Sequence, residues 1–208
     1  MAKGSRGGKS GRYPGGGLGA GDILSTTDFI SERGAYTETV DGVLTVARDV
    51  GDEYGLLVDY EMAEIKASAG AIAYYGGGTI GWNKAYADSK KLNDSYDDCV
   101  KSGFHPGRGN RTAAEAVAAH EYGHALTDKA VAKLGARNLE DAANMIVKEA
   151  RKQTKHKGVV IMSRKISTYA TSSNAEAIAE AFSDVYCNGK KAKSESRAIV
   201  SVLNKYAK

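Results

Sequence analysis

The apolar positions of the N-terminal half fall in short runs. Residues 43–47 and 56–60 are rich in Val, Leu and Thr and are bounded by Gly or Asp, which is typical of β-strands between turns. Residues 61–69 are expected to form a short helix. The run 78–83 predicts another strand, and its glycines favour an edge of the sheet or a close approach of another backbone. Further along, the apolar run 159–162 also predicts a strand.

Capping signals and helical spacing dominate the second half. Thr112 and Glu115 have the Ser/Thr-x-x-Glu spacing of a capping box at the start of an Ala-rich helix, and Gly135 is suited to its end. Asn138 and Ser173 are placed to cap two further helices. The expected helices are 88–102, 113–134, 139–156, 174–187 and 194–206, and residues 103–110 are expected to be a loop.

One segment of the Ala-rich helix carries the clearest chemical signal. His120-Glu-Tyr-Gly-His124 matches the H-E-x-x-H pattern of zinc-dependent peptidases. Four residues advance an α-helix by about 400°, so both imidazoles project from one face and can bind one metal ion. Glu121 lies about 100° from His120 around the helix, where a carboxylate can act as general base without binding the metal. The pattern predicts a catalytic zinc site more strongly than a pair of core histidines.

A catalytic zinc ion needs a third protein ligand, and the residues alone leave two assignments open. Glu176, Glu180 and Asp184 recur every four residues on one predicted helix. In the first assignment Glu176 binds the metal and Glu180 orients a ligand histidine; in the second, Glu180 binds the metal and Asp184 supports it. Glu176 also completes a capping box with Ser173, which is a purely structural use of its carboxylate.

The two segments together resemble the catalytic core of the anthrax lethal-factor-type gluzincin peptidases. The resemblance rests on His120-Glu-Tyr-Gly-His-Ala-Leu and on Tyr169-Ala-x-x-x-x-x-Glu176-x-x-Ala-Glu180-x-Phe. Metallopeptidase-like domains of bacteriophage virion and head-morphogenesis proteins are similar as well. The matching region spans residues 78–187. The resemblance implies an α+β, zincin-like fold, in which a small twisted mixed sheet packs on the active-site helix and a second helix carries the third ligand.

The resemblance also implies roles for individual residues. One zinc ion per chain would be bound by His120, His124 and Glu176, with Glu180 behind a ligand histidine and Tyr169 stabilising the oxyanion. Peptide bonds would be hydrolysed by a zinc-activated water, with Glu121 as the general base. The segment 180–184 is similar to the Glu-x-x-Ser-Asp segment of thermolysin-like enzymes, which favours the second assignment, with Glu180 as ligand and Asp184 as its support.

Substrate contacts are expected on the strand 78–83. Zincins run an edge strand beside the active-site helix, and a peptide substrate adds to it as a further strand. Ile80, Gly81 and Trp82 are therefore the predicted substrate-binding residues. His105, in the segment Phe-His-Pro-Gly, is interpreted as a loop residue rather than a substrate or metal contact.

Charge separates the N-terminal arm from the rest of the chain. The 208 residues have a net charge of +4, and residues 1–21 carry four basic residues, nine glycines and no acid. We expect this segment to be a flexible arm and residues 22–208 to form a single domain. The C-terminal residues 148–208 are basic, and three of their five acids are Glu176, Glu180 and Asp184, which favours a bound cation.

Other features bear on compartment and partners. We expect neither a signal peptide nor a transmembrane segment, and hence a protein of the host cytoplasm or of a virion that has no membrane partner. Cys99 and Cys187 favour free thiols over a disulfide. The basic arm could contact nucleic acid or a neighbouring subunit.

Three functions stay open from the sequence. The first is a zinc metalloendopeptidase acting on a peptide or protein substrate. The second is a virion assembly protein whose zinc site has little or no proteolytic activity, and the third is a toxin protease acting on a host protein. Glu121 favours an enzyme, because a structural zinc site is usually closed by four protein ligands and needs no general base.

Overall fold

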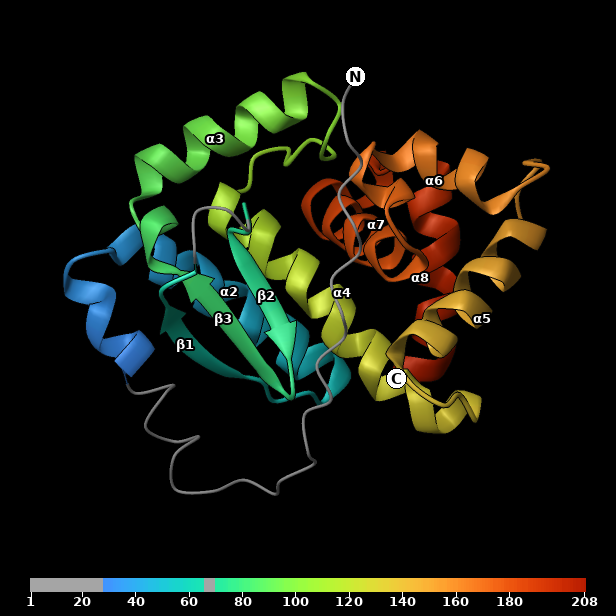
Figure 1. Ribbon diagram of the computed structural model, residues 1–208, viewed down its shortest axis with the longest axis horizontal. Coiled ribbons are helices and arrows are strands. Elements are labelled where there is room, and N and C mark those ends of the chain that lie inside the picture. The colour runs from blue at the N-terminus through green and yellow to red at the C-terminus, as the bar shows by residue number, and fades with distance from the viewer. Residues whose placement is uncertain (1–27, 66–69) are drawn as a thin grey trace, which may run out of the picture.

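The protein is an α+β molecule that is mostly helical and contains a small three-stranded mixed sheet (Figure 1). The computed structural model describes residues 28–65 and 70–208. The predicted arm, residues 1–21, lies outside these ranges. In Figure 1 the helix α4 (Ala113–Leu134) runs between the sheet on one side and the helices α5 to α8 on the other. This helix carries the H-E-x-x-H segment, so the proposed site lies between two parts of the fold.

The sheet has the order β1-β3-β2. Strand β1 (Asp59–Ala63) pairs in parallel with β3 (Thr79–Asn83), and β2 (Ala73–Gly76) pairs antiparallel to β3. The predicted strand 78–83 is therefore confirmed, but its predicted edge position is wrong, because strands flank it on both sides. The Tyr74 ring packs over Gly81 and leaves no room for a side chain there, because a Cβ built at Gly81 would lie 2.2 Å from Cε1 of Tyr74.

The predictions for two short apolar runs and for one short helix were wrong. Residues 43–47 belong to helix α2 (Thr37–Tyr54), and residues 159–162 begin helix α6 (Val159–Ile166). In α2 the buried valines recur at helical spacing, which an isolated five-residue window does not reveal. Residues 61–63, expected to be helical, form the end of β1. The strand expected at 56–60 begins at Asp59, three residues later.

The helices α4, α5 and α7 begin at their predicted capping residues. Thr112 and Glu115 form the predicted capping box of α4, and Gly135 ends that helix in the left-handed conformation with a φ of 63°. Asn138 and Ser173 accept hydrogen bonds from the first turns of the helices that they precede. Asn138 precedes α5 (Leu139–Lys152), which is four residues shorter than expected, and Ser173 precedes α7 (Asn174–Asn188). The other two helices predicted in this half of the chain are α3 (Ser89–Lys101) and α8 (Ser194–Ala207).

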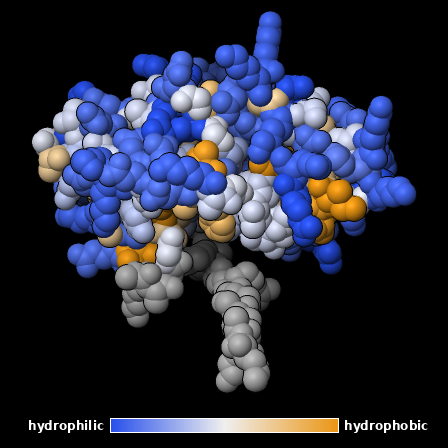
Figure 2. Space-filling view, turned by 90° about the horizontal axis from the view of Figure 1, so that it is seen from above, coloured by the Kyte–Doolittle hydropathy of each residue, from blue (hydrophilic) through white to orange (hydrophobic). Residues whose placement is uncertain are grey.

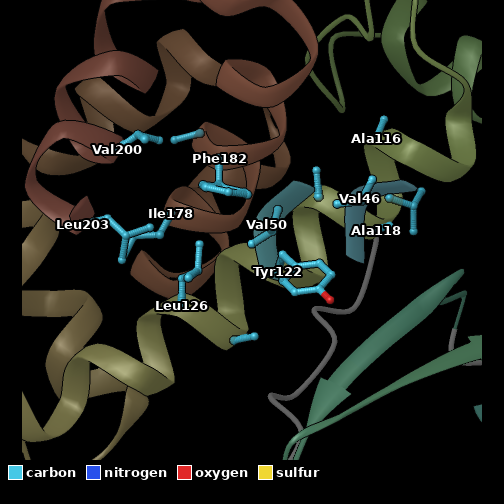
Figure 3. Close-up of a cluster of buried hydrophobic side chains, with 14 of the residues drawn as sticks. Val46, Val50, Ala116, Ala118, Tyr122, Leu126, Ile178, Phe182, Val200 and Leu203 are labelled. Atoms are coloured by element: carbon cyan, nitrogen blue, oxygen red, sulfur yellow. The ribbon is translucent and has the colours of Figure 1, made fainter. Parts of the chain in front are cut away.

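The main core surrounds α4. Figure 3 shows Tyr122 and Leu126 of α4 beside valines of α2 and apolar side chains of α7 and α8. Gly123 packs against the backbone of α7, where an added Cβ would lie 2.6 Å from Cα of Ala179. The small residue at this position lets α4 and α7 approach closely. That approach brings His120 and His124 of α4 close to Glu176 of α7.

Short elements complete the chain. They are the 3₁₀ turns η1 (Glu32–Gly34), η3 (Lys84–Tyr86), η4 (Tyr169–Thr171) and η5 (Gly189–Lys191). Cys99 and Cys187 are free thiols, as predicted. Within the described ranges, the helices lack the combination of length and apolar character needed to cross a membrane. Figure 2 shows a mostly hydrophilic face with small, separate hydrophobic patches.

Candidate metal centre

Helix α4 presents three side chains of the H-E-x-x-H segment toward one point. His120 and His124 lie one turn apart, with ring centroids separated by 5.0 Å. Their side chains are 12% and 14% exposed, so both rings are reachable without being free in solvent. The carboxylate of Glu121 is buried beside them. Burial raises the pKa of Glu121, and the two histidines oppose this shift only in part.

Helix α7 supplies the third candidate ligand. Oε2 of Glu176 lies 3.1 Å from Nε2 of His120 and 3.5 Å from Nε2 of His124. The three candidate ligand atoms, one from each residue, all lie within 4.8 Å of one another. Ser173 uses its hydroxyl to accept a hydrogen bond from the Glu176 backbone N–H. The Glu176 carboxylate turns toward the histidines, so the capping signal does not occupy it.

The chemistry of this cluster suits a divalent cation. Oε2 of Glu176 is buried and, in the described part of the chain, its close polar contacts are the two histidine Nε2 atoms, neither in hydrogen-bond geometry; a buried carboxylate oxygen without a hydrogen bond is costly. Burial raises the pKa of Glu176, but His120 and His124 outweigh it and hold the pKa well below its usual range. Two imidazole nitrogens and one carboxylate oxygen match the donors of catalytic zinc sites. The His120–His124–Glu176 group could therefore hold a metal ion.

Glu180 contacts Nδ1 of His120, the ring nitrogen that does not face Glu176. Its Oε1 lies 2.9 Å from Nδ1 of His120, and its Oε2 accepts a hydrogen bond from the Ser167 hydroxyl at 2.7 Å. Burial raises the pKa of Glu180, but hydrogen bonds from His105 and His120 lower it to about 2. An ionised carboxylate at Nδ1 holds the proton of His120 on that nitrogen and leaves Nε2 free to bind a metal. This geometry corresponds to the first of the two assignments that the sequence left open.

His105 joins this network. Its Nδ1 lies 2.9 Å from Oε1 of Glu180, the same oxygen that His120 contacts. The ring stacks on Tyr96, with centroids 5.3 Å apart and an interplanar angle of 2°. His105 lies in a loop, as the sequence predicted. Its contact with Glu180 beside the candidate metal ligands was not predicted. No spacing rule links His105 to α4, and the only cue in the sequence was the scarcity of histidine, with four in the chain.

Tyr169 lies on η4, next to the candidate ligands. Its ring stacks on His120, with centroids 5.9 Å apart, and on Phe104, with centroids 5.1 Å apart. Its backbone N–H donates to the carbonyl of Phe104 at 3.1 Å. Burial and the carboxylates of Glu176, Glu121 and Glu180 raise the pKa of Tyr169, so its hydroxyl stays protonated at neutral pH. The structure thus brings the predicted tyrosine to the same site.

Two groups of predicted residues lie elsewhere. The supporting role predicted for Asp184 is wrong, because its carboxylate accepts hydrogen bonds from the Ser196 hydroxyl at 2.6 Å and the Lys193 backbone N–H at 2.9 Å. It fixes the start of α8 instead. The substrate-binding role predicted for Ile80, Gly81 and Trp82 fails because β3 is the central strand and all three residues are buried. His156 also lies outside the candidate group, where its Nε2 pairs with Glu195 at 2.7 Å.

A cavity of about 380 Å³ adjoins the candidate ligands. One side consists of the segment that leads into β2, and the other consists of aromatic and apolar side chains beside His120 and Glu121. Its lining includes Gly70, Ala71, Ile72, Ala73, Tyr96, Phe104, His105, Val117, His120, Glu121, Tyr169 and Glu180. Strand β2, and not β3, is the edge strand of the sheet that borders this cavity.

Comparisons of the chain with family models, with curated proteins and with solved structures returned no match.

Proposed function

We propose that the protein is a zinc-dependent metallopeptidase with a zincin-like fold. The observation that carries this proposal is the convergence of His120 Nε2 and His124 Nε2 on the buried Oε2 of Glu176, with Glu121 beside them. A purely structural zinc site would be closed by a fourth protein ligand. In the described residues the group contains three candidate ligands, and one of them, His120, lines a cavity together with Glu121 and Tyr169.

His120, His124 and Glu176 would hold the zinc ion. When bound, zinc would activate a water molecule and polarise the peptide carbonyl. Glu121 would take a proton from the attacking water on a carboxylate oxygen and pass it to the nitrogen of the leaving amine. Burial supports this role, because it raises the pKa of Glu121 toward the range where a carboxylate accepts protons at neutral pH.

Tyr169 would donate a hydrogen bond to the carbonyl oxygen as negative charge develops on it. Two features support this role: the hydroxyl remains protonated, and the ring lies against His120 on the wall of the cavity. Substrate backbone would bind along β2, an edge strand of the described sheet that borders the cavity, as a further strand. This proposal replaces the β3 contacts expected from the sequence.

The proposal is tested by zinc content and peptide cleavage measured on the same preparations. The full chain and its Glu121→Gln variant are loaded with zinc and incubated with a diverse peptide pool, and products are identified by mass spectrometry. We expect about one zinc per chain in both proteins and cleavage by the unmodified chain alone. Glu38→Gln, at an exposed position in the first turn of α2, is the matched control and should cleave normally. Equal cleavage by Glu121→Gln would remove Glu121 from the mechanism.

A further inference from the structure

His105 has one polar atom that the fold does not use. Its Nδ1 contacts Glu180, whose side chain is 1% exposed. The rest of the ring is enclosed by aromatic neighbours: Tyr96 stacks on it, and Phe104 and Tyr169 approach it edge-to-face at centroid distances of 4.9 Å and 5.5 Å. In the described part of the chain, no group forms a hydrogen bond with Nε2.

This ring also lies on the wall of the cavity. His105 lines the cavity together with Glu121 and Tyr169, and its side chain is 14% exposed. The ring centroid is 6.4 Å from that of His120. His105 is not one of the three residues whose ligand atoms cluster at the candidate metal position. His105 is therefore placed to contact a substrate, whereas His120, His124 and Glu176 are placed to bind the metal.

The contact with Glu180 determines whether Nε2 of His105 can accept a hydrogen bond. A carboxylate beside Nδ1 keeps the proton on that nitrogen, which leaves a lone pair on Nε2 in the neutral ring. We infer that His105 is a catalytic residue whose Nε2 accepts a hydrogen bond from a backbone N–H of the peptide at the reaction centre, an inference that rests on the proposed peptidase function. Glu180 then positions two histidines for different tasks, His120 toward the metal and His105 toward the substrate.

A positioning role for His105 would be distinct from this one. In that case only the Nδ1–H would matter, because it would hold Glu180 and through it His120. The amide nitrogen of an asparagine can occupy the place of Nδ1, whereas the terminal amide of a glutamine reaches the place of Nε2. The variants His105→Asn and His105→Gln therefore separate the two roles.

The experiment measures zinc affinity by chelator competition, and kcat and KM on a peptide selected from the pool that the unmodified chain cleaves. We expect His105→Gln to stay within about threefold of the unmodified kcat/KM, and His105→Asn to lose about tenfold, with the zinc affinity of His105→Asn unchanged. His156→Asn alters a histidine that also pairs with a glutamate but lies away from the cavity, and it should match the unmodified chain. Circular dichroism checks that each variant is folded.

A second measurement does not depend on the Asn variant. In the selected peptide, each N–H next to the cleaved bond is replaced in turn by an ester oxygen. One replacement should weaken cleavage by the unmodified chain and have little further effect on His105→Ala. The inference would be overturned if ester replacement at every position weakened cleavage by His105→Ala as much as cleavage by the unmodified chain. It would also be overturned if His105→Asn kept full activity while His105→Gln lost activity. If the unmodified chain cleaves no peptide, the proposed function itself fails; cleavage that is indifferent to His105 refutes the His105 role alone.

Discussion

Oε1 of Glu180 lies 2.9 Å from Nδ1 of His120, although the two residues belong to different helices and are separated by sixty positions in the chain. A carboxylate in this place fixes both the orientation of the imidazole and the nitrogen that carries its proton. Glu176, one turn earlier on α7, faces the Nε2 atoms of the two histidines. Adjacent turns of one helix thus supply a candidate ligand and the residue that orients another ligand.

This division of roles predicts different zinc affinities for two variants. Glu176→Ala should lose tight zinc binding, whereas Glu180→Ala should bind zinc about 10–100-fold more weakly than the unmodified chain. Zinc should raise the unfolding temperature of the unmodified chain, because a ligand that binds only the folded state stabilises it. Glu176→Ala should show no such rise. Tight stoichiometric binding by Glu176→Ala, together with its loss in Glu180→Ala, would support the thermolysin-like assignment instead.

Asp184 should affect stability without affecting zinc. Its carboxylate accepts hydrogen bonds from Lys193 and Ser196 at the start of α8, so Asp184→Asn should lower the free energy of unfolding by about 1–3 kcal/mol. Urea unfolding of the metal-free protein measures this change. Zinc affinity, measured by chelator competition, should equal that of the unmodified chain; a large decrease would place Asp184 back at the metal site.

Gly123 should be intolerant of a methyl group. An added Cβ would lie 2.6 Å from Cα of Ala179, so Gly123→Ala has to push α4 and α7 apart. We expect the free energy of unfolding to fall by about 1–3 kcal/mol and zinc affinity to weaken, because the two helices carry the ligands. Gly34→Ala is the matched control, since nothing lies within 4 Å of its added Cβ. Unchanged stability and zinc affinity in Gly123→Ala would contradict the close approach of the two helices at this residue.

The Glu195–His156 pair predicts a pH-dependent contribution to stability. Burial raises the pKa of Glu195, but hydrogen bonds, the first of them from His156, lower it below its ordinary value. A carboxyl group whose pKa is lower in the folded state stabilises the fold above its unfolded pKa, and this contribution is lost as pH falls through the folded pKa. Glu195→Gln should therefore be less stable than the unmodified chain at neutral pH. The difference should shrink in acid, as followed by urea unfolding at several pH values; a constant difference would exclude this linkage.

The sequence predicted the elements whose signals are local. The capping box at Thr112, the glycine at 135 and the cap at Ser173 predicted the ends of the long helices, because a cap involves only neighbouring residues. The H-E-x-x-H spacing likewise placed two imidazoles on one face of α4, since helix geometry alone decides that. Short apolar runs were less informative: residues 43–47 and 159–162 were expected to be strands but form helices.

Long-range packing decided the rest of the candidate site. From the residues alone, two assignments of ligand and supporting residue stayed open for Glu176, Glu180 and Asp184, and only the packing of α7 on α4 and α8 gave each its neighbour. The same packing brought His105 to Glu180 across seventy-five positions. The sequence by itself determined where α4, α5 and α7 begin and that His120 and His124 face one way, because those properties depend on residues within a few turns. The meeting of Glu176 with the two histidines, the shared contacts of Glu180 and the strand that borders the cavity were decided by tertiary structure, because they depend on contacts between segments that no local pattern connects.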